Sequence, residues 1–481
     1  MRRVASIVMA VLCAVAAFVS GVHAGDCKRV GNLYHWRNLE DGHSLGPESF
    51  SVWVPDTADI VKGLFFLGSH GLCPGANNRD FVWTDTAFQS FARQFGFGML
   101  GTNAMCGMQY WHKQTNILKG GLEDMAAIGD HPELQHVPLV VFGASGAGAA
   151  AYTLVNSMAD RIICSTPTVP HWRVPEFGYG PGAGTVPLFM AIGELDGGYG
   201  AENWDRTVDG ARNGLGALWA WSEIQGMGHE GRNTGHVQRV YWEKCIRMRY
   251  PADANPRLGP IDLIDIPEES GWLGCSDYRE NGMATLAPFN EYTGEKYDAS
   301  WMPDEDMAWL WRSLTEWHTP VIMNVSWNGR TISAYGDAPV NVPLGDNIRI
   351  SVNDGGLSWS KVEFFRGSAK IGEVTSGTPE LVYTIGDESI AQTFVVLVHT
   401  ADRVYSAPPV GVGTILPRQV NAIDAPYRAV SVARKTTAAG ATALYDLRGR
   451  TAARSRAYGA VGARVLVGND GAGSRLVVIR R

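Results

Sequence analysis

The sequence predicts an α/β domain with a mainly parallel sheet, followed by an all-β sandwich and a small β module. Two observations indicate this arrangement. Up to about residue 318, apolar runs typical of strands alternate with helical stretches, which is the pattern of a parallel sheet flanked by helices. After Thr319-Pro320, short strands follow one another between Gly, Asn, Asp and Pro turns, as in a β-sandwich.

Short apolar runs predict the strands of the first domain, which is expected over residues 25–318. Their positions are residues 61–67, 96–101, 137–142, 161–164, 186–192 and 218–224. Helices are expected at residues 84–95, where the pattern is amphipathic, and at residues 120–129. In a sheet of this kind, ligands bind at the carboxyl ends of the strands.

The sandwich is expected over residues 319–411 and the terminal module, with its linker, over residues 412–481. Sandwich strands are predicted at residues 340–342, 347–352, 361–365, 370–374, 381–385 and 393–399. The terminal module is marked by the segments at residues 443–450, 465–467 and 476–479. From Asp402 onward Arg and Lys outnumber Asp and Glu, so the terminal module is basic although the rest of the chain is acidic.

The N-terminus predicts export. Arg2 and Arg3 precede an apolar run over residues 4–19, and Val22-His23-Ala24 supplies a small-residue cleavage site before Gly25. This pattern is typical of a secretory signal peptide, here residues 1–24, and the run is too short for a membrane-spanning helix. We therefore expect a secreted or surface-attached protein without a membrane-spanning segment.

Cysteine usage and charge exclude several function classes. One of the seven cysteines lies in the predicted signal peptide, and the other six precede residue 280. An even set in an exported chain predicts disulfides, although the sequence does not give their pairing. Without C-x-x-C spacing, a zinc site or redox motif is not expected. The formal net charge of −7 argues against nucleic acid as a partner.

Ser145 lies at the most informative point of the chain. An apolar run over residues 138–142 leads into Gly143-Ala144-Ser145-Gly146-Ala147, and an Ala-rich helical stretch follows. A serine between a strand and a helix sits on a strained bend, with its hydroxyl exposed beside the helix N-terminus. Small neighbours let the strand and the helix pack closely. The segment therefore predicts the nucleophile elbow of a serine hydrolase.

Two other interpretations of this segment stay open. Gly143, Gly146 and Gly148 after a strand would also suit a dinucleotide-binding turn, because a helix N-terminus with nearby glycines binds phosphates. The glycine spacing departs from that fingerprint, however, and the next strand ends in Ser165-Thr166 without an acid to bind a ribose. The third interpretation is a turn that serves only close packing.

A serine nucleophile needs a general base and an acid that orients the base. Asp196, after the strand predicted at residues 186–192, is the predicted acid, and Glu194 is the second candidate. His229, in a glycine-framed loop after the next strand, is the predicted base and is preferred to His236. The order serine, acid, histidine along the chain matches that of α/β-hydrolases.

The oxyanion formed by attack on an ester needs two N–H donors. One is expected from Gly146, the residue after the nucleophile. The other is expected from Gly71 or Leu72, in the loop after the strand at residues 61–67. The His-Gly pair of that loop looks like the oxyanion loop of esterases, and His70 itself is then expected to be structural.

With these elements in place, residues 27–318 resemble the secreted α/β-hydrolase esterases of the feruloyl esterase, acetylxylan esterase and polyhydroxybutyrate depolymerase group. The passage through His131-Pro132-Glu133-Leu134 is similar too. Ala144 stands where a His or Trp is common, and Ala147 replaces the final Gly of G-x-S-x-G. The resemblance implies an α/β-hydrolase fold and a serine esterase without metal or cofactor.

Aromatic and histidine residues that follow strand ends are candidates for the lining of a substrate cleft. They are Trp111, His112, His171, Trp172 and Trp204. Aromatic faces stack on sugar rings or on a feruloyl ring, although packing in the core is the alternative role for any single Trp.

Two further resemblances concern the C-terminal third. Residues 362–374 resemble the bacterial Ig-like modules of exported polysaccharide-degrading enzymes. The segment Tyr445-Asp446-Leu447-Arg448-Gly449-Arg450 looks like the turn of C-terminal sorting domains, and this resemblance implies contact with secretion machinery or attachment to the cell surface. A basic module that adheres to acidic polymers is the alternative.

The predicted function is that of an exported serine esterase that removes feruloyl or acetyl groups from plant cell-wall polysaccharide, its acylated substrate. A polyester or lipid hydrolase would use the same triad, and a non-catalytic carbohydrate-binding surface protein could have the same scaffold. All three stay open at this point.

Overall fold

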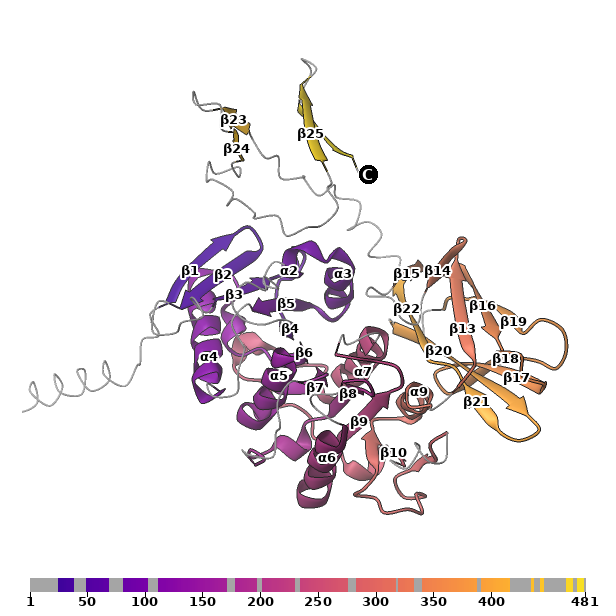
Figure 1. Cartoon of the computed structure of the whole chain (residues 1–481). Coiled ribbons are helices and arrows are strands. Elements are labelled where there is room, and N and C mark those ends of the chain that lie inside the picture. The colour runs from indigo at the N-terminus through magenta and orange to yellow at the C-terminus, as the bar shows by residue number, and fades with distance from the viewer. Residues whose placement is uncertain are drawn as a thin grey trace, which may run out of the picture. The chain divides into compact units, whose positions relative to one another are not determined.

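The computed structural model divides the chain into two compact units, Met1–Val420 and Asn421–Arg481 (Figure 1). The residues that the structure describes are 25–38, 49–68, 81–102, 111–170, 178–196, 201–229, 234–275, 283–316, 319–332, 340–386, 391–415, 434–436, 442–444, 464–469 and 474–479. Within these residues, no helix combines the length and apolar character that crossing a membrane requires.

A nine-stranded mixed sheet forms the first half of the larger unit, in the order β1-β2-β3-β5-β4-β6-β7-β8-β9. The first three strands are antiparallel, and β3 pairs antiparallel with β5. From β5 to β9 neighbouring strands are parallel. The strands are β1 (Gly25–Val30), β2 (Leu33–Asn38), β3 (Ser49–Trp53), β4 (Gly63–Gly68), β5 (Phe97–Thr102), β6 (Leu139–Ala144), β7 (Ile162–Thr168), β8 (Leu188–Gly193) and β9 (Trp219–Ile224).

Helices cover both faces of this sheet, because alternate side chains of each strand enter opposite cores. Leu64 and Phe66 of β4 share one buried cluster with α4 (Trp111–Ile128), α5 (Gly146–Ser157) and α6 (Ala201–Leu215). Phe65 shares the other with α3 (Thr86–Phe95), α7 (Thr234–Arg249) and α9 (Glu305–Leu314). The elements α2 (Phe81–Thr84), η3 (Pro132–Gln135), η4 (Ala159–Arg161), η6 (Ala183–Thr185), η7 (Pro256–Leu258) and η8 (Glu268–Ser270) complete the connections.

Helix α4 is longer than the sequence predicts. It begins at Trp111 rather than near residue 120 and runs through two consecutive glycines. Gly121 lies against the sheet, where a Cβ atom would come within 3.1 Å of Trp36 and 3.2 Å of Phe50. The glycine therefore serves close packing between helix and sheet, which a sequence pattern cannot distinguish from a helix end.

The described cysteines differ from the prediction that they form disulfides. Cys27, Cys164 and Cys245 carry thiols rather than disulfides, and Cys73 and Cys106 lie outside the described residues. Cys164 of β7 and Cys245 of α7 are fully buried and share a hydrogen bond. Burial raises the pKa of Cys164 well above its usual value, and burial together with Asp124 and Asp26 raises that of Cys27 to about 12. These thiols act as small core side chains.

The remaining part of the larger unit contains a small sheet and a β-sandwich. The small sheet has the order β11-β10-β12, with β10 (Trp272–Gly274), β11 (Leu286–Pro288) and β12 (Ser300–Met302). The first sandwich sheet, β14-β13-β16-β19, contains β13 (Ile322–Trp327), β14 (Arg330–Ile332), β16 (Asn347–Asn353) and β19 (Glu380–Thr384). The second, β15-β22-β20-β17-β18, contains β15 (Asn341–Pro343), β17 (Trp359–Arg366), β18 (Ala369–Val374), β20 (Ala391–Thr400) and β22 (Val410–Ile415), with β21 (Val404–Ser406) beside β20.

The two sandwich sheets enclose one buried cluster, to which Val325, Ile350, Phe364 and Val396 contribute. Strand β22 extends this sandwich to Ile415, beyond the expected boundary at residue 411. In the smaller unit the described residues form two hairpins, β23 (Arg434–Thr436) with β24 (Thr442–Leu444), and β25 (Arg464–Asn469) with β26 (Ser474–Ile479).

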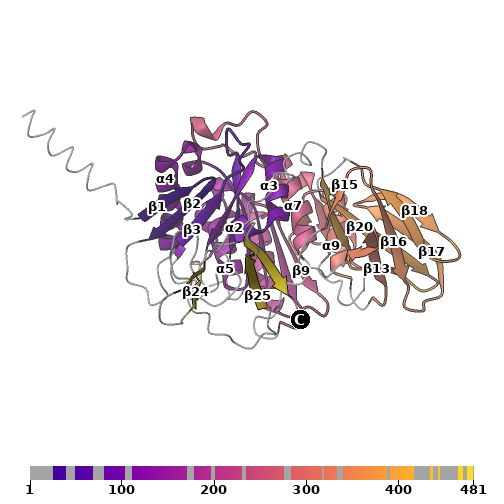
Figure 2. The same cartoon turned by 90° about the horizontal axis from the view of Figure 1, so that it is seen from above.

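The sandwich packs directly on α7 and α9, which lie beside β20 in both views (Figures 1 and 2). Phe365, Val395 and Leu397 of the sandwich belong to the same buried cluster as the two helices. In addition, the backbone N–H of Ala391 donates to the carboxylate of Glu243 on α7 at 3.0 Å. The core of the α/β part therefore continues into the sandwich.

Candidate active site

Ser145 stands between β6 and α5 in a conformation that few residues adopt. Its φ is 57° and its ψ is −125°. A positive φ at a non-glycine residue stores strain, and such residues concentrate at functional sites. The Ser145 N–H donates to the carbonyl of Thr168 at the end of β7, at 3.0 Å, which ties the bend to the neighbouring strand.

Small residues around the bend are required by contact. A Cβ atom at Gly143 would lie 2.0 Å from the carbonyl oxygen of Ala147, and one at Gly68 would lie 2.7 Å from the Ala147 Cβ. One at Gly148 would lie 3.0 Å from Pro170. Gly143 therefore allows β6 to approach α5 closely. Gly68 on β4 leaves room for the Ala147 side chain, which stands where a glycine is common.

His229 lies in contact with both Ser145 and Asp196. Its Nε2 is 2.8 Å from the Ser145 Oγ, and its Nδ1 is 3.0 and 2.9 Å from the two carboxylate oxygens of Asp196. With an ionised Asp196, the neutral imidazole donates its Nδ1–H to the carboxylate and accepts the serine proton at Nε2. The Asp196 side chain is 5% exposed and that of His229 is 34% exposed.

Each of the three residues follows a parallel strand. Ser145 follows β6, Asp196 follows β8 and His229 follows β9, so the carboxyl edge of the sheet brings together residues up to 84 positions apart. Glu194, the second candidate for the acid, does not contact the imidazole. Its Oε2 instead accepts the backbone N–H of Gly226 at 2.8 Å.

Helix α7 contributes support that sequence reasoning missed. The Gln238 side chain donates to the Oγ1 of Thr168 at 2.7 Å, and the indole N–H of Trp242 donates to the Oγ1 of Thr166 at 2.9 Å. Thr168 is the residue whose carbonyl accepts the Ser145 N–H. The two bonds join the helix after the histidine loop to the strand beside the elbow, and no local sequence pattern points to pairs 70 and 76 residues apart.

The other predicted site residues are placed only in part. Gly146 is the first residue of α5, where a helix N–H has no acceptor within the helix, and the space above it is open for 4 Å. Trp111 and His112 begin α4, Trp204 lies in α6 and His236 in α7, with side chains outside the described set. The predicted residues that lie outside the described ones are His70, Gly71, Leu72, His171 and Trp172.

Among the described residues, no group of three or more His, Cys, Asp or Glu side chains could hold a metal ion. Ser145, His229 and Asp196 together supply a hydroxyl in hydrogen-bond contact with an imidazole, a buried carboxylate behind the ring, and a helix N-terminus beside the hydroxyl. This is the set that nucleophilic catalysis by serine requires.

No family model and no curated protein matches the chain. Among solved structures, it is similar to an S-formylglutathione hydrolase from Agrobacterium tumefaciens, with 11% identity, a TM-score of 0.33, and coverage of 46% of this chain and 98% of that one. An acetyl xylan esterase from Paenibacillus sp. R4 has 13% identity, a TM-score of 0.29, and coverage of 43% and 83%. Fibronectin(III)-like modules of Clostridium thermocellum CbhA have 23% identity, a TM-score of 0.15, and coverage of 19% and 93%.

The architecture of the chain itself defines the fold of the α/β part. Parallel strands β5-β4-β6-β7-β8-β9 stand beside an antiparallel β3, and a strained serine joins β6 to α5. An acid and a histidine then follow at the ends of β8 and β9, in the order that α/β-hydrolases use. The part of the chain that precedes the sandwich has an α/β-hydrolase fold.

Proposed function

We propose that the protein is a serine carboxylesterase. One observation carries the proposal, the continuous chain of contacts from Ser145 Oγ through His229 to Asp196, with heavy-atom distances of 2.8 and 2.9 Å. The α/β-hydrolase fold and the strained bend at Ser145 support it further. A serine that only packed or hydrogen-bonded in a core would need neither the strain nor a partly exposed imidazole.

The proposed reaction has two halves. His229 takes the hydroxyl proton of Ser145 at Nε2 as Oγ attacks the ester carbonyl, and Asp196 stabilises the imidazolium that forms. The N–H of Gly146 donates to the oxyanion of the tetrahedral intermediate. His229 then gives its proton to the departing alcohol, which leaves an acyl-enzyme on Ser145. Water, activated by His229, releases the acid and restores the serine.

The proposed substrate is an acylated plant cell-wall polysaccharide that carries feruloyl or acetyl esters. The resemblance of residues 27–318 to secreted esterases and of residues 362–374 to modules of polysaccharide-degrading enzymes supports this choice. The signal-peptide pattern of residues 1–24 supports export, and the resemblance of Tyr445-Asp446-Leu447-Arg448-Gly449-Arg450 to the turn of sorting domains supports sorting or attachment at the cell surface.

The test uses the full mature chain. A fluorophosphonate probe should label Ser145, as located by mass spectrometry of the labelled peptide, and parallel assays should compare feruloylated xylan, acetylated xylan and polyhydroxybutyrate. The highest kcat/KM is expected on one of the two xylans. Preference for polyhydroxybutyrate would make the protein a polyester hydrolase, and absence of labelling and turnover would make it a non-catalytic surface protein.

A further inference from the structure

Two loops at the carboxyl edge of the sheet are joined by backbone hydrogen bonds. We name residues 193–196 the acid loop and residues 224–229, which begin with the last residue of β9, the histidine loop. The N–H of Glu194 donates to the carbonyl of Ile224 at 3.1 Å, and that of Leu195 donates to the carbonyl of Met227 at 2.9 Å. Gly193 permits this approach, because a Cβ atom there would lie 2.3 Å from the Met227 oxygen.

The Glu194 side chain makes a third link between the same loops. Its Oε2 accepts the N–H of Gly226 at 2.8 Å. Gly226 has a φ of 68°, and it lies in the turn that the N–H of Met227 closes on the carbonyl of Ile224 at 3.3 Å. A bond from an N–H to a carboxylate is charge-assisted, and this one lies at the surface, where solvent screens it.

The neighbourhood of the imidazole explains why this turn matters. His229 lies three residues after Gly226 and must keep its Nε2 at 2.8 Å from the serine and its Nδ1 at 2.9 Å from Asp196 at the same time. The bonds to the Asp196 carboxylate hold the imidazole ring itself. The position of the backbone that carries the ring depends instead on the turn at Gly226. A displacement of about 1 Å in a catalytic group can lower the rate about 100-fold.

We infer that Glu194 is a positioning residue: its carboxylate clamps the turn at Gly226 and thereby sets the place of the His229 ring. The inference rests on the proposed function, because it concerns the same site. Asp196 and Glu194, which are two residues apart, then have different roles. Asp196 orients the imidazole by direct contact, and Glu194 fixes the loop from which the imidazole projects.

Two variants separate this role from its alternatives. Glu194→Ala removes the acceptor, whereas Glu194→Gln keeps an amide oxygen that can accept the Gly226 N–H. With p-nitrophenyl acetate and active-site titration, Glu194→Ala should lower kcat per titrated site about tenfold with KM nearly unchanged. Glu194→Gln should recover most of the loss. Fluorophosphonate labelling of Ser145 should slow in the same proportion, since it also requires the base.

The matched control is Glu269→Ala, which removes an exposed carboxylate from a 3-10 turn outside both loops and should leave kcat unchanged. Wild-type kcat per titrated site in Glu194→Ala would overturn the inference. So would a loss in Glu194→Gln equal to that in Asp196→Asn, which would make Glu194 the orienting acid. Failure of the proposed function is a separate result, because Ser145→Ala would then keep the wild-type turnover.

Discussion

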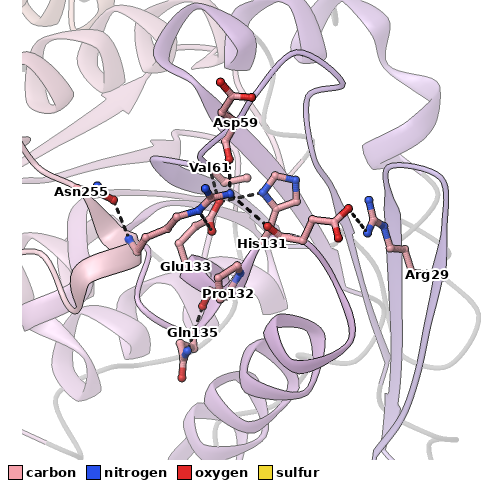
Figure 3. Close-up of polar contacts among 10 residues, drawn as sticks. Arg29, Asp59, Val61, His131, Pro132, Glu133, Gln135 and Asn255 are labelled. Atoms are coloured by element: carbon pink, nitrogen blue, oxygen red, sulfur yellow. Dashed lines mark hydrogen bonds and ion pairs between the residues drawn. The ribbon is translucent and has the colours of Figure 1, made fainter.

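Two carboxylate–imidazole pairs stand at opposite ends of the parallel strands. At the carboxyl end, Asp196 lies 2.9 Å from the Nδ1 of His229. At the amino end, before β6, the carboxylate of Glu133 lies 2.9 Å from the Nδ1 of His131 (Figure 3). The acid–histidine contacts are alike in length and in the ring nitrogen used. Their surroundings give them different roles.

Hydrogen bonds and an ion pair link the Glu133–His131 pair to other segments of the chain. The Glu133 side chain is fully buried, and it accepts the backbone N–H of Val61 at 2.8 Å and the Nε–H of Arg257 at 3.1 Å. Arg257 in turn donates to the carbonyl of Asp130 at 3.2 Å. Burial alone would raise the pKa of Glu133, but these bonds outweigh burial and hold it below the usual value. The carboxylate thus joins three segments at the amino ends of the strands.

The two pairs differ in what surrounds the acid and the histidine. The Asp196–His229 pair has a serine on the second ring nitrogen, and its imidazole is partly exposed. The His131 side chain is only 11% exposed, and the charge of its acid is neutralised by an arginine. A proton can be passed on in the first pair, whereas the second is a charge-balanced structural link.

Removal of the sandwich should have the largest effect, because it exposes the apolar surface through which α7 and α9 pack on the sandwich. Helix α7 packs on the sandwich through Glu243 and the shared apolar cluster, and its Gln238 supports the strand beside Ser145. The sequence favours residues 25–318 as an independent catalytic unit, but these contacts lead us to expect an insoluble or inactive fragment. Expression, sedimentation and turnover of p-nitrophenyl acetate test this. A soluble fragment with full-length turnover would support the boundary near residue 318.

Ser145→Ala should abolish ester hydrolysis while the fold is kept. The new side chain is smaller and adopts the same strained bend, so only the nucleophile is lost. Loss of a triad member lowers turnover on the order of 10⁴- to 10⁶-fold. Turnover and the melting temperature of the two proteins are the measurements. A rate near that of the wild type would remove Ser145 from the catalytic role.

Asp196→Asn should lower turnover about 10⁴-fold, because the amide no longer holds the imidazole in the tautomer that accepts the serine proton. The matched substitution in the other pair, Glu133→Gln, should leave kcat per titrated site near the wild-type value. Side-by-side titration and steady-state kinetics measure both. Equal losses in the two variants would contradict the distinction between the pairs.

Glu133→Gln should instead lower the free energy of unfolding. Breaking a buried ion pair costs 3–5 kcal/mol in general, and partial exposure of Arg257 places this one at about 3 kcal/mol or less. The depressed pKa of Glu133 gives stability that is present above the ordinary carboxyl pKa and is lost as the pH falls through the lower folded value. Urea unfolding across the acid range should therefore show a weaker pH dependence in the variant. An unchanged dependence would exclude Glu133 as its source.

Local patterns allowed much of this molecule to be predicted. Five of the six parallel strands lie within two residues of their expected positions, because an apolar run between turn residues is a local signal, whereas β7 runs four residues beyond its expected end. The strained bend at Ser145 follows from small residues within one segment. The antiparallel strands β1 to β3 were not predicted. Strands β1 and β2 are partly exposed and contain many polar residues, which gives a weak pattern, whereas β3 is buried but only five residues long.

The sequence by itself determined the positions of the parallel strands along the chain, the elbow, and the acid and histidine candidates, because each is a property of neighbouring residues. Tertiary structure decided which carboxylate meets which imidazole. Asp196 and Glu194 are two residues apart, yet only the packing of one loop on another gives the first to His229 and the second to Gly226. It also decided that Glu133 is a structural acid and that the sandwich supports α7, because these contacts join segments 100 or more residues apart whose distance no local pattern encodes.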